Sequence, residues 1–247
     1  MTKIPRWKKW ISHIWPLTFE VTESDHNSYL EVSLVQGRLQ LVAEDAIYSF
    51  GDYYLNFRKT FDRFEFIEIP EQSDVLVLGL GLGSVPELLV DFWELDYNIT
   101  AVEIDPVIVD LASEYSLPFL SAPIEVINAD ALYFLQLDAR RYDLICMDVF
   151  QDADIPKEFQ TEDYLQLLED SLNPGGALIY NRLASTPQDR KLSQDFFDNY
   201  FLTVFPKGVI LDTGGNYMLI NDKKFLTSPS DEENLPRMPG RIQWKIR

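Results

Sequence analysis

The sequence predicts an α/β protein in which helices cover both faces of a mostly parallel sheet, with a small antiparallel β unit in front. From Asp74 onward, short apolar runs alternate with amphipathic stretches, which is typical of strand–helix–strand units. Before that point, two runs of alternating polarity flank Gln36-Gly37, a turn signal that indicates a hairpin. The last two predicted strands form an antiparallel hairpin that closes the main sheet.

Each element carries its own local signal of apolar periodicity. The antiparallel unit is predicted to contain strands at 18–22, 28–34 and 38–43 and to end near 48–51, before a helix at 52–61. The main domain is predicted to contain strands at 74–78, 99–103, 124–128, 142–147 and 177–180 and the closing hairpin of 209–211 and 217–220. Its helices are predicted at 84–92, after Asp105-Pro106, at 161–172 and at 187–200.

Two motifs mark helix ends. Ser84-Val-Pro-Glu87 has the pattern of a capping box, and Asn173-Pro174-Gly175-Gly176 is a stop signal for the helix before it. We place a basic N-terminal segment and small β domain at 1–60, the main domain at 61–227 and a polar tail at 228–247.

The composition is that of a globular protein. Apolar residues make up 46% and charged residues 25% of the 247 positions. No stretch approaches the roughly 20 apolar residues of a membrane helix, and the basic N-terminus lacks the apolar core and cleavage site of a signal peptide. A single cysteine, Cys146, leaves no internal disulfide. We therefore expect a cytoplasmic protein.

The net charge of −19 is spread unevenly along the chain. Residues 1–16 and 237–247 each carry four basic groups and no acid, which leaves 13 of the 21 basic residues and all 40 acidic residues between them. A body of net charge −27 repels nucleic acid phosphates and attracts small cations. Neither nucleic acid nor a membrane is the expected partner.

The segment from Trp7 to Trp15 combines tryptophans with basic side chains and has two interpretations. It can touch an anionic surface as an amphipathic anchor. The expected alternative is that it packs against the protein's own acidic body or against a second subunit.

The motif Gly79-Leu-Gly-Leu-Gly83-Ser84 lies between a predicted strand and a predicted helix. Glycines allow a tight turn that a ligand can approach, and the helix start offers unpaired N–H groups. A dinucleotide site favours glycine or alanine where this chain has Ser84. A glycine turn without a ligand is the other possibility.

Acidic residues follow three of the predicted strands. Glu103 ends the second strand 20 residues after Gly83, at the place where nucleotide-binding sheets hold a ribose, whereas Asp105 is the expected cap of the next helix. In Asn128-Ala-Asp130-Ala131, Asp130 either accepts the adenine amine or caps a helix.

Asp148 follows the fourth strand beside the expected reversal of strand order, where open α/β sheets bind ligands. It is placed to accept a proton from an amine, or else it caps the loop. Asp152 and Asp154 are candidates for a cation-attracting rim. Cys146 lies in an apolar strand and is expected to be buried and inert.

The motifs GLGLGS, VEIDP, NADA, YDLICMD and LNPGG occur in an order that resembles the spermidine synthase branch of the class I methyltransferase-like fold, over roughly residues 28–222. The resemblance implies a Rossmann-like, seven-stranded sheet behind an N-terminal β domain. It implies that the nucleoside site is lined by Gly79, Gly81, Gly83, Glu103, Asp130 and Ala131. It also implies that Asp148 is the catalytic acid, that no metal is needed, and that the protein is a homodimer.

Several positions depart from that family's pattern. Leu82 stands where the family's glycine loop carries an aspartate, and Gln151 stands where a second strand-four aspartate is usual, with Asp152 one step along. The family's proline–tyrosine–proline loop is replaced by 212–216, and the lead-in around Tyr48 is altered. Gln151, Asp152 and Tyr48 are the candidates for a substrate rim.

The resemblance implies aminopropyl transfer from decarboxylated S-adenosylmethionine to a small amine such as a polyamine. The alternatives are an S-adenosylmethionine-dependent methyltransferase and a non-catalytic module that binds S-adenosylmethionine or methylthioadenosine. Loss of the acid at Leu82 removes one reason to exclude intact S-adenosylmethionine, since a nearby acid repels its carboxylate. Binding of a nicotinamide dinucleotide is a remote fourth alternative.

Overall fold

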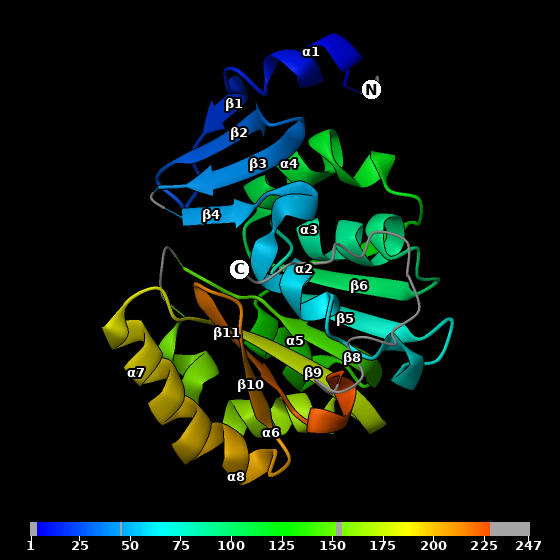
Figure 1. Ribbon diagram of the computed structural model, residues 1–247, viewed down its shortest axis with the longest axis vertical. Helices are drawn as coiled ribbons and strands as arrows, with labels where there is room; N and C mark the ends of the chain where they lie inside the picture. The colour runs from blue at the N-terminus through cyan, green and yellow to red at the C-terminus, as the bar shows by residue number, and fades with distance from the viewer. Residues whose placement is uncertain (1–3, 45, 152–154, 228–247) are drawn as a thin grey trace, which may run out of the picture.

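The computed structural model describes residues 4–44, 46–151 and 155–227. These residues form a four-stranded antiparallel sheet followed by a seven-stranded sheet with helices on both faces (Figure 1). The small sheet and α1 (Arg6–Ile11) lie at one end of the long axis, above the larger sheet. The predicted α/β fold is therefore confirmed, while the predicted tail at 228–247 lies outside the described residues.

The small sheet follows chain order, with neighbouring strands antiparallel. Its strands are β1 (Leu17–Thr22), β2 (Leu30–Val35), β3 (Arg38–Ala43) and β4 (Ala46–Ser49). Gln36 and Gly37 both have positive φ, as a two-residue hairpin turn of this kind requires. The three predicted strands are confirmed, and β4 is an additional strand that was not expected.

The larger sheet has the order β10-β11-β9-β8-β5-β6-β7. Its strands are β5 (Asp74–Leu78), β6 (Asn98–Glu103), β7 (Ile124–Asn128), β8 (Tyr142–Met147), β9 (Leu172–Leu183), β10 (Val209–Asp212) and β11 (Asn216–Ile220). The first five are parallel, and β10 and β11 form the predicted antiparallel hairpin. Because β5 lies between β6 and β8, the strand order reverses beside it, and the carboxyl ends of these three strands are where a ligand is expected.

Helices cover both faces of the larger sheet. They are α2 (Leu55–Phe61), α3 (Ser84–Glu87), α4 (Pro106–Tyr115), α5 (Ala131–Leu137), α6 (Glu162–Asp170), α7 (Pro187–Phe196) and α8 (Leu202–Val204). Alternate residues of β5 point to opposite faces, so Val75 and Val77 pack with α2, α3, α4 and the small sheet, whereas Leu76 and Leu78 pack with α5 and α6. This two-sided burial explains why the strand is apolar throughout.

Short helical segments join or extend these elements. The 3₁₀ segments are Gly51–Tyr53, Phe66–Glu68, Leu117–Phe119, Lys157–Gln160 and Lys223–Phe225, and the π-helical turns are Leu88–Phe92 and Phe197–Phe201. The helices predicted at 84–92 and 187–200 therefore change winding partway. No helix among the described residues is both long enough and apolar enough to cross a membrane.

The predicted capping box at Ser84 and Glu87 is wrong. The residue before α3 is Gly83, which has a left-handed conformation, and no side chain caps the helix. The Ser84 hydroxyl is engaged elsewhere, because it lies 2.7 Å from the Ser49 hydroxyl and accepts the N–H of Phe50 at 2.9 Å. Ser84 therefore ties the end of β4 to the glycine loop.

The region around the predicted stop signal also differs from expectation. Helix α6 ends at Asp170, and β9 begins two residues later, so Asn173-Pro174-Gly175-Gly176 lies inside a strand. The Thr161 hydroxyl accepts the N–H of Tyr164 and caps the start of α6. Strand β9 also runs on to Leu183, beyond the predicted end at residue 180, and this extension carries Asn181 to the functional site.

Candidate active site

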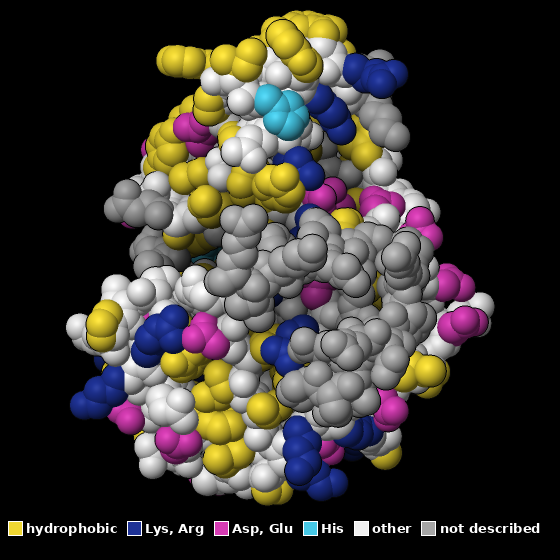
Figure 2. Space-filling view, in the orientation of Figure 1, with side chains coloured by type: hydrophobic (Ala, Val, Ile, Leu, Met, Phe, Trp, Pro, Cys, Tyr) yellow, Lys and Arg dark blue, Asp and Glu magenta, His cyan; other side chains and the backbone are white. Residues whose placement is uncertain are grey.

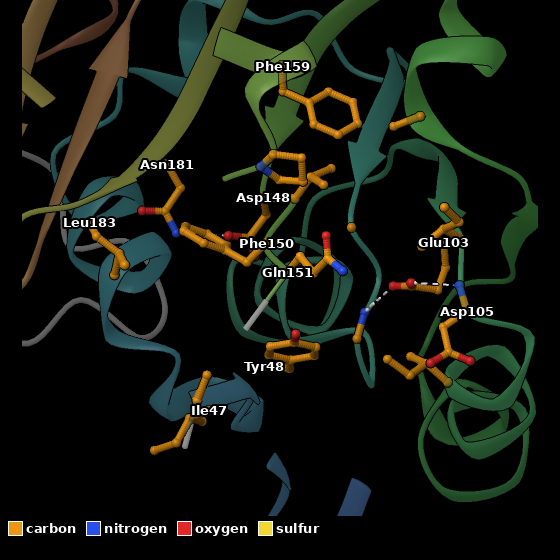
Figure 3. A pocket seen from close by; sticks show the side chains of 18 of the residues that line it. Ile47, Tyr48, Glu103, Asp105, Asp148, Phe150, Gln151, Phe159, Asn181 and Leu183 are labelled. Carbon is orange, nitrogen blue, oxygen red and sulfur yellow. Dashed lines mark hydrogen bonds between the residues drawn. The ribbon is translucent and has the colours of Figure 1, made fainter. Parts of the chain in front are cut away.

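A cavity of about 800 Å³ lies at the carboxyl ends of the parallel strands. Its walls come from the end of β4 and from the loops that follow β5, β6, β7 and β8. Figure 3 shows Asp148 and Glu103 on two sides of this space, with Tyr48 between them at its lower wall. The cavity therefore lies where the strand order reverses, which is where open α/β sheets bind ligands.

The glycine loop is packed against backbone from two other segments. Gly79 has φ +91°, and a Cβ there would lie 2.3 Å from the carbonyl oxygen of Asp148. Gly81 has φ +54°, and its Cβ would lie 3.0 Å from the carbonyl oxygen of Tyr48. Both glycines line the cavity, whereas Gly83 precedes α3 outside it. The loop needs glycine at 79 because only hydrogen fits there.

We expect Gly79→Ala to lower the melting temperature by about 4–8 °C, since left-handed backbone and backbone overlap together cost about 2 kcal/mol or more. The matched control is Gly175→Ala, where φ is +86° but the nearest atom to the new Cβ is the Lys224 ammonium at 3.9 Å. Thermal unfolding of both variants measures the difference. Equal shifts would mean that the contact with Asp148 is not what excludes a side chain.

Glu103 connects the glycine loop to the start of α4. One carboxylate oxygen, Oε2, accepts the N–H groups of Leu80 at 3.1 Å and Gly81 at 3.2 Å, and Oε1 accepts the N–H of Asp105 at 3.1 Å. Figure 3 shows the bonds from Gly81 and Asp105. Burial raises the pKa of this carboxyl group, and the three N–H donors oppose that rise. A carboxylate has about four acceptor sites, so Oε1 retains room for a ligand hydroxyl.

The prediction that Asp105 caps α4 is confirmed, because its Oδ1 accepts the N–H of Val107 at 2.9 Å. It has a further role that the sequence did not reveal. Its Oδ2 accepts the Ser24 hydroxyl at 2.5 Å and the Asn27 amide at 2.7 Å. The loop between β1 and β2 is thereby fixed beside the cavity, where His26 and Asn27 form part of the wall.

Asp130 and Ala131 line the cavity at the start of α5. The Asp130 Oδ1 accepts the N–H of Leu132 at 2.8 Å and of Tyr133 at 3.1 Å, so this residue is the helix cap. The cap and the ligand contact are compatible, since a carboxylate has two oxygens. Contact with adenine stays a prediction.

Asp148 sits at the centre of a polar network. The Asn181 amide donates to its Oδ1 at 2.8 Å, and Asn181 in turn accepts the amide of Asn216 at 2.8 Å. The Tyr54 hydroxyl is a further hydrogen-bond partner. Burial, together with the charge of Glu103, raises the pKa of Asp148 to about 7, against the opposing effect of Asn181 and Tyr54. The carboxyl group is therefore poised to exchange a proton near neutral pH.

Three members of this network were missed from the sequence. Tyr54 precedes α2, Asn181 lies in the extension of β9, and Asn216 begins β11. All three line the cavity. The only signal in the sequence was that Asn181 is polar directly after an apolar strand, at the same sheet edge as Asp148.

The structure describes only part of the predicted substrate rim. Tyr48 and Gln151 line the cavity, while Asp152 and Asp154 lie outside the described residues. Leu82 is buried in the apolar core and is not part of the cavity wall. Cys146 is buried, and burial raises the pKa of its thiol well above the ordinary value, which agrees with an inert side chain.

The described cavity wall is acidic. It includes six carboxyl groups and, apart from His26, no basic side chain. The carboxyl groups belong to Glu103, Asp105, Asp130, Asp148, Glu158 and Asp189. Among the described residues, no three His, Cys, Asp or Glu side chains gather in a way that suits a metal ion. Such a wall attracts a cation and repels a carboxylate.

Comparison with known proteins gives relatives that are named as aminopropyltransferases. A "Probable polyamine aminopropyl transferase" of Bifidobacterium longum is 35% identical over 109 residues, which span 44% of this chain and 24% of that protein. A "Polyamine aminopropyltransferase" of Vibrio vulnificus is 30% identical over 120 residues, which span 47% of this chain and 40% of that protein. The chain therefore matches less than half the length of these relatives.

Two solved structures share the fold. Spermidine synthase from Thermotoga maritima superposes with a TM-score of 0.66 at 15% identity, covering 90% of this chain and 80% of that chain. Human methyltransferase-like protein 13 in complex with SAH superposes with a TM-score of 0.55 at 26% identity, covering 68% of this chain and 80% of that chain. The first of these likenesses shows the fold alone.

The decisive match is to a family. The model of the spermine/spermidine synthase domain matches residues 63–206, which is more than half of the chain. This segment contains the glycine loop and all the strand-end acids from Glu103 to Asp148. The chain belongs to the spermine/spermidine synthase domain family.

Proposed function

We propose that this protein transfers an aminopropyl group from decarboxylated S-adenosylmethionine to an amine acceptor. The observation that carries the proposal is Asp148, a carboxyl group with a pKa of about 7 at the reversal of strand order. It lies in an acidic cavity that also contains Glu103 and the glycine loop. The family membership and the aminopropyltransferase relatives support the same chemistry.

The residues present fit an adenosine-type donor. Gly79 and Gly81 leave a backbone surface without side chains, and Glu103 is fixed beside that surface by three N–H donors. Oε1 of Glu103 is assigned to a ribose hydroxyl, and Asp130 and Ala131 to the adenine edge. When bound, the donor supplies a carbon activated by a sulfonium and a neutral thioether as leaving group.

Asp148 acts on the acceptor. As a carboxylate it attracts the protonated amine, holds it in line with the donor and takes one proton, which leaves a nucleophilic lone pair on nitrogen. Its raised pKa makes it a stronger base than an exposed aspartate. The bonds from Asn181 and Tyr54 hold the carboxyl group in place, and a carboxylate still has acceptor sites left for the amine.

The charge of the cavity wall favours the decarboxylated donor. Intact S-adenosylmethionine carries an α-carboxylate, and the described wall offers it no lysine or arginine. The aminopropyl arm of the decarboxylated form ends in an ammonium group, which the acidic cavity wall attracts. Tyr48 and Gln151 are assigned to the rim of the acceptor site, and Asp152 joins them as the nearest acid in the sequence.

Methyl transfer from intact S-adenosylmethionine is the second candidate. One observation favours it: Leu82 is buried in the core, so the acid expected at that place is missing from the cavity. The likeness to human methyltransferase-like protein 13 in complex with SAH supports it as well. A homodimer and a cytoplasmic location remain predictions.

Product analysis separates the two candidates. We expect incubation with decarboxylated S-adenosylmethionine and a panel of polyamines to release methylthioadenosine, because the cavity selects a cationic donor. Chromatography with mass detection identifies the thioether that forms. If S-adenosylhomocysteine forms from intact S-adenosylmethionine and no methylthioadenosine forms, the protein is a methyltransferase and the proposal of aminopropyl transfer is wrong.

A further inference from the structure

The N-terminal end of the molecule presents an exposed apolar face. The side chains of Trp7, Trp10, Ile14 and Trp15 are 60%, 69%, 72% and 73% exposed. They belong to α1 and the turn that follows it. Figure 2 shows hydrophobic side chains gathered over this end of the molecule, with basic side chains beside them. We refer to these four residues as the tryptophan face.

The tryptophan face is held in place by the small sheet. The carbonyl oxygen of Ser12 accepts the N–H of Gln36 at 2.9 Å, and the Ser12 hydroxyl accepts the N–H of Gly37 at 2.8 Å. The Lys8 ammonium lies 5.2 Å from the centre of the Phe19 ring in β1. The segment therefore packs against the small sheet through Ser12 and Lys8, while its tryptophans point outward. Packing against a second subunit stays a prediction.

The charge beside this face is basic. Arg6, Lys8 and Lys9 lie on α1, and residues 1–16 contain no acid. A symmetric contact between two copies through this face would bring the same three cations together, which is unfavourable. Charge complementarity therefore selects an anionic partner.

The shape of this end suits a flat partner. Helix α1 lies at the tip of the long axis, beyond the small sheet (Figure 1). Tryptophan side chains favour the headgroup level of a bilayer, and lysine and arginine beside them bind anionic lipid. We propose that the tryptophan face docks this protein reversibly on the surface of a bilayer that contains anionic lipid. This departs from the expectation of no membrane partner, because composition alone did not reveal that the tryptophans are exposed.

The rest of the molecule determines how it approaches the bilayer. Residues outside the two basic ends carry a net charge of −27, so an anionic surface repels the body and attracts the basic tip that carries α1. Added salt weakens the attraction, since charges are screened over about 8 Å at physiological ionic strength. This docking is independent of the proposed transfer reaction.

The test is sedimentation of the full chain with two kinds of vesicle, phosphatidylcholine alone and phosphatidylcholine mixed with an equal part of phosphatidylglycerol. We expect binding to the anionic vesicles and little to the neutral ones. The double variant Trp10→Ser/Trp15→Ser and the double variant Arg6→Glu/Lys9→Glu are each expected to lower the partition coefficient by about tenfold or more. All four positions are exposed, so we expect both variants to fold.

The matched control replaces exposed apolar residues elsewhere. Ile67 and Leu137 are each 85% exposed, and Ile67→Ser/Leu137→Ser is expected to leave vesicle binding unchanged. Wild-type tryptophan emission is expected to shift to shorter wavelength on anionic vesicles, with no shift in the tryptophan variant. Equal binding to the two kinds of vesicle overturns the proposal. So does a loss of vesicle binding in the control variant as large as that in the tryptophan variant. So does absence of binding together with a dimer that the tryptophan variant dissociates, which would make this face an interface between copies.

Discussion

Asp148→Asn is expected to lower kcat by about 10²–10⁴-fold while methylthioadenosine still binds, because the variant keeps the shape of the side chain but cannot take a proton. Asparagine can still accept the Asn181 amide that now bonds to Oδ1. Steady-state kinetics with the decarboxylated donor, and calorimetric titration of methylthioadenosine, measure the two effects. An unchanged kcat would mean that another group accepts the proton.

The stability of the same variant provides a control for folding. The folded protein raises the pKa of Asp148 from 3.8 to about 7, so the folded state binds this proton more tightly than the unfolded state. Its contribution to stability is complete below the unfolded pKa and is lost as the pH rises through the folded pKa. The melting temperature of Asp148→Asn is therefore expected to rise relative to that of the wild type between about pH 4 and pH 7.

The wild-type pH profile follows from the same group. Since the carboxylate is the active form, kcat/KM is expected to rise with pH through a limb near the pKa of about 7. That limb is expected to disappear in Asp148→Asn. A limb that persists in the variant would have to come from a different group, such as the amine of the acceptor.

Glu103→Ala is expected to weaken methylthioadenosine binding by about 10–100-fold, the loss of one or two hydrogen bonds to a charged acceptor. The effect has two sources. The ribose loses its acceptor, and the N–H groups of Leu80 and Gly81 lose the carboxylate that orders the glycine loop. Calorimetric titration of the variant measures the loss.

Two further variants interpret that result. Glu103→Gln keeps one acceptor oxygen and is expected to bind with intermediate affinity. Glu125→Ala removes an acid from the neighbouring strand β7, where it pairs with Arg140 outside the cavity wall, and is expected to bind like the wild type. Equal affinity of Glu103→Ala and the wild type would mean that the ribose is held elsewhere.

Much of the fold was predictable because the strands are buried on both faces. The run from Asp74 to Leu78 is apolar except at its start, and its predicted bounds match those of β5. The same regularity brought Glu103 and Asp148 to one cavity, since the carboxyl ends of neighbouring parallel strands meet at one edge of a sheet. Local periodicity therefore located the acids without any knowledge of their contacts.

Contacts between distant segments were not predictable in the same way. Tyr54 and Asn181 bond to Asp148, and Asn216 bonds to Asn181. These residues come from three separate parts of the chain, and no local pattern links them. The Ser84 motif failed for a related reason. Its hydroxyl has a partner 35 positions earlier, at the end of β4, and this tertiary bond competes with the local cap.

Calorimetric titration of the wild-type protein with methylthioadenosine, decarboxylated S-adenosylmethionine and intact S-adenosylmethionine tests the central claim most directly. We predict one site per chain that binds the first two, and weaker binding of the intact form because the acidic wall repels its carboxylate. If none of the three binds, the cavity is not an adenosyl site. If intact S-adenosylmethionine binds most tightly, the acidic wall does not select the decarboxylated donor.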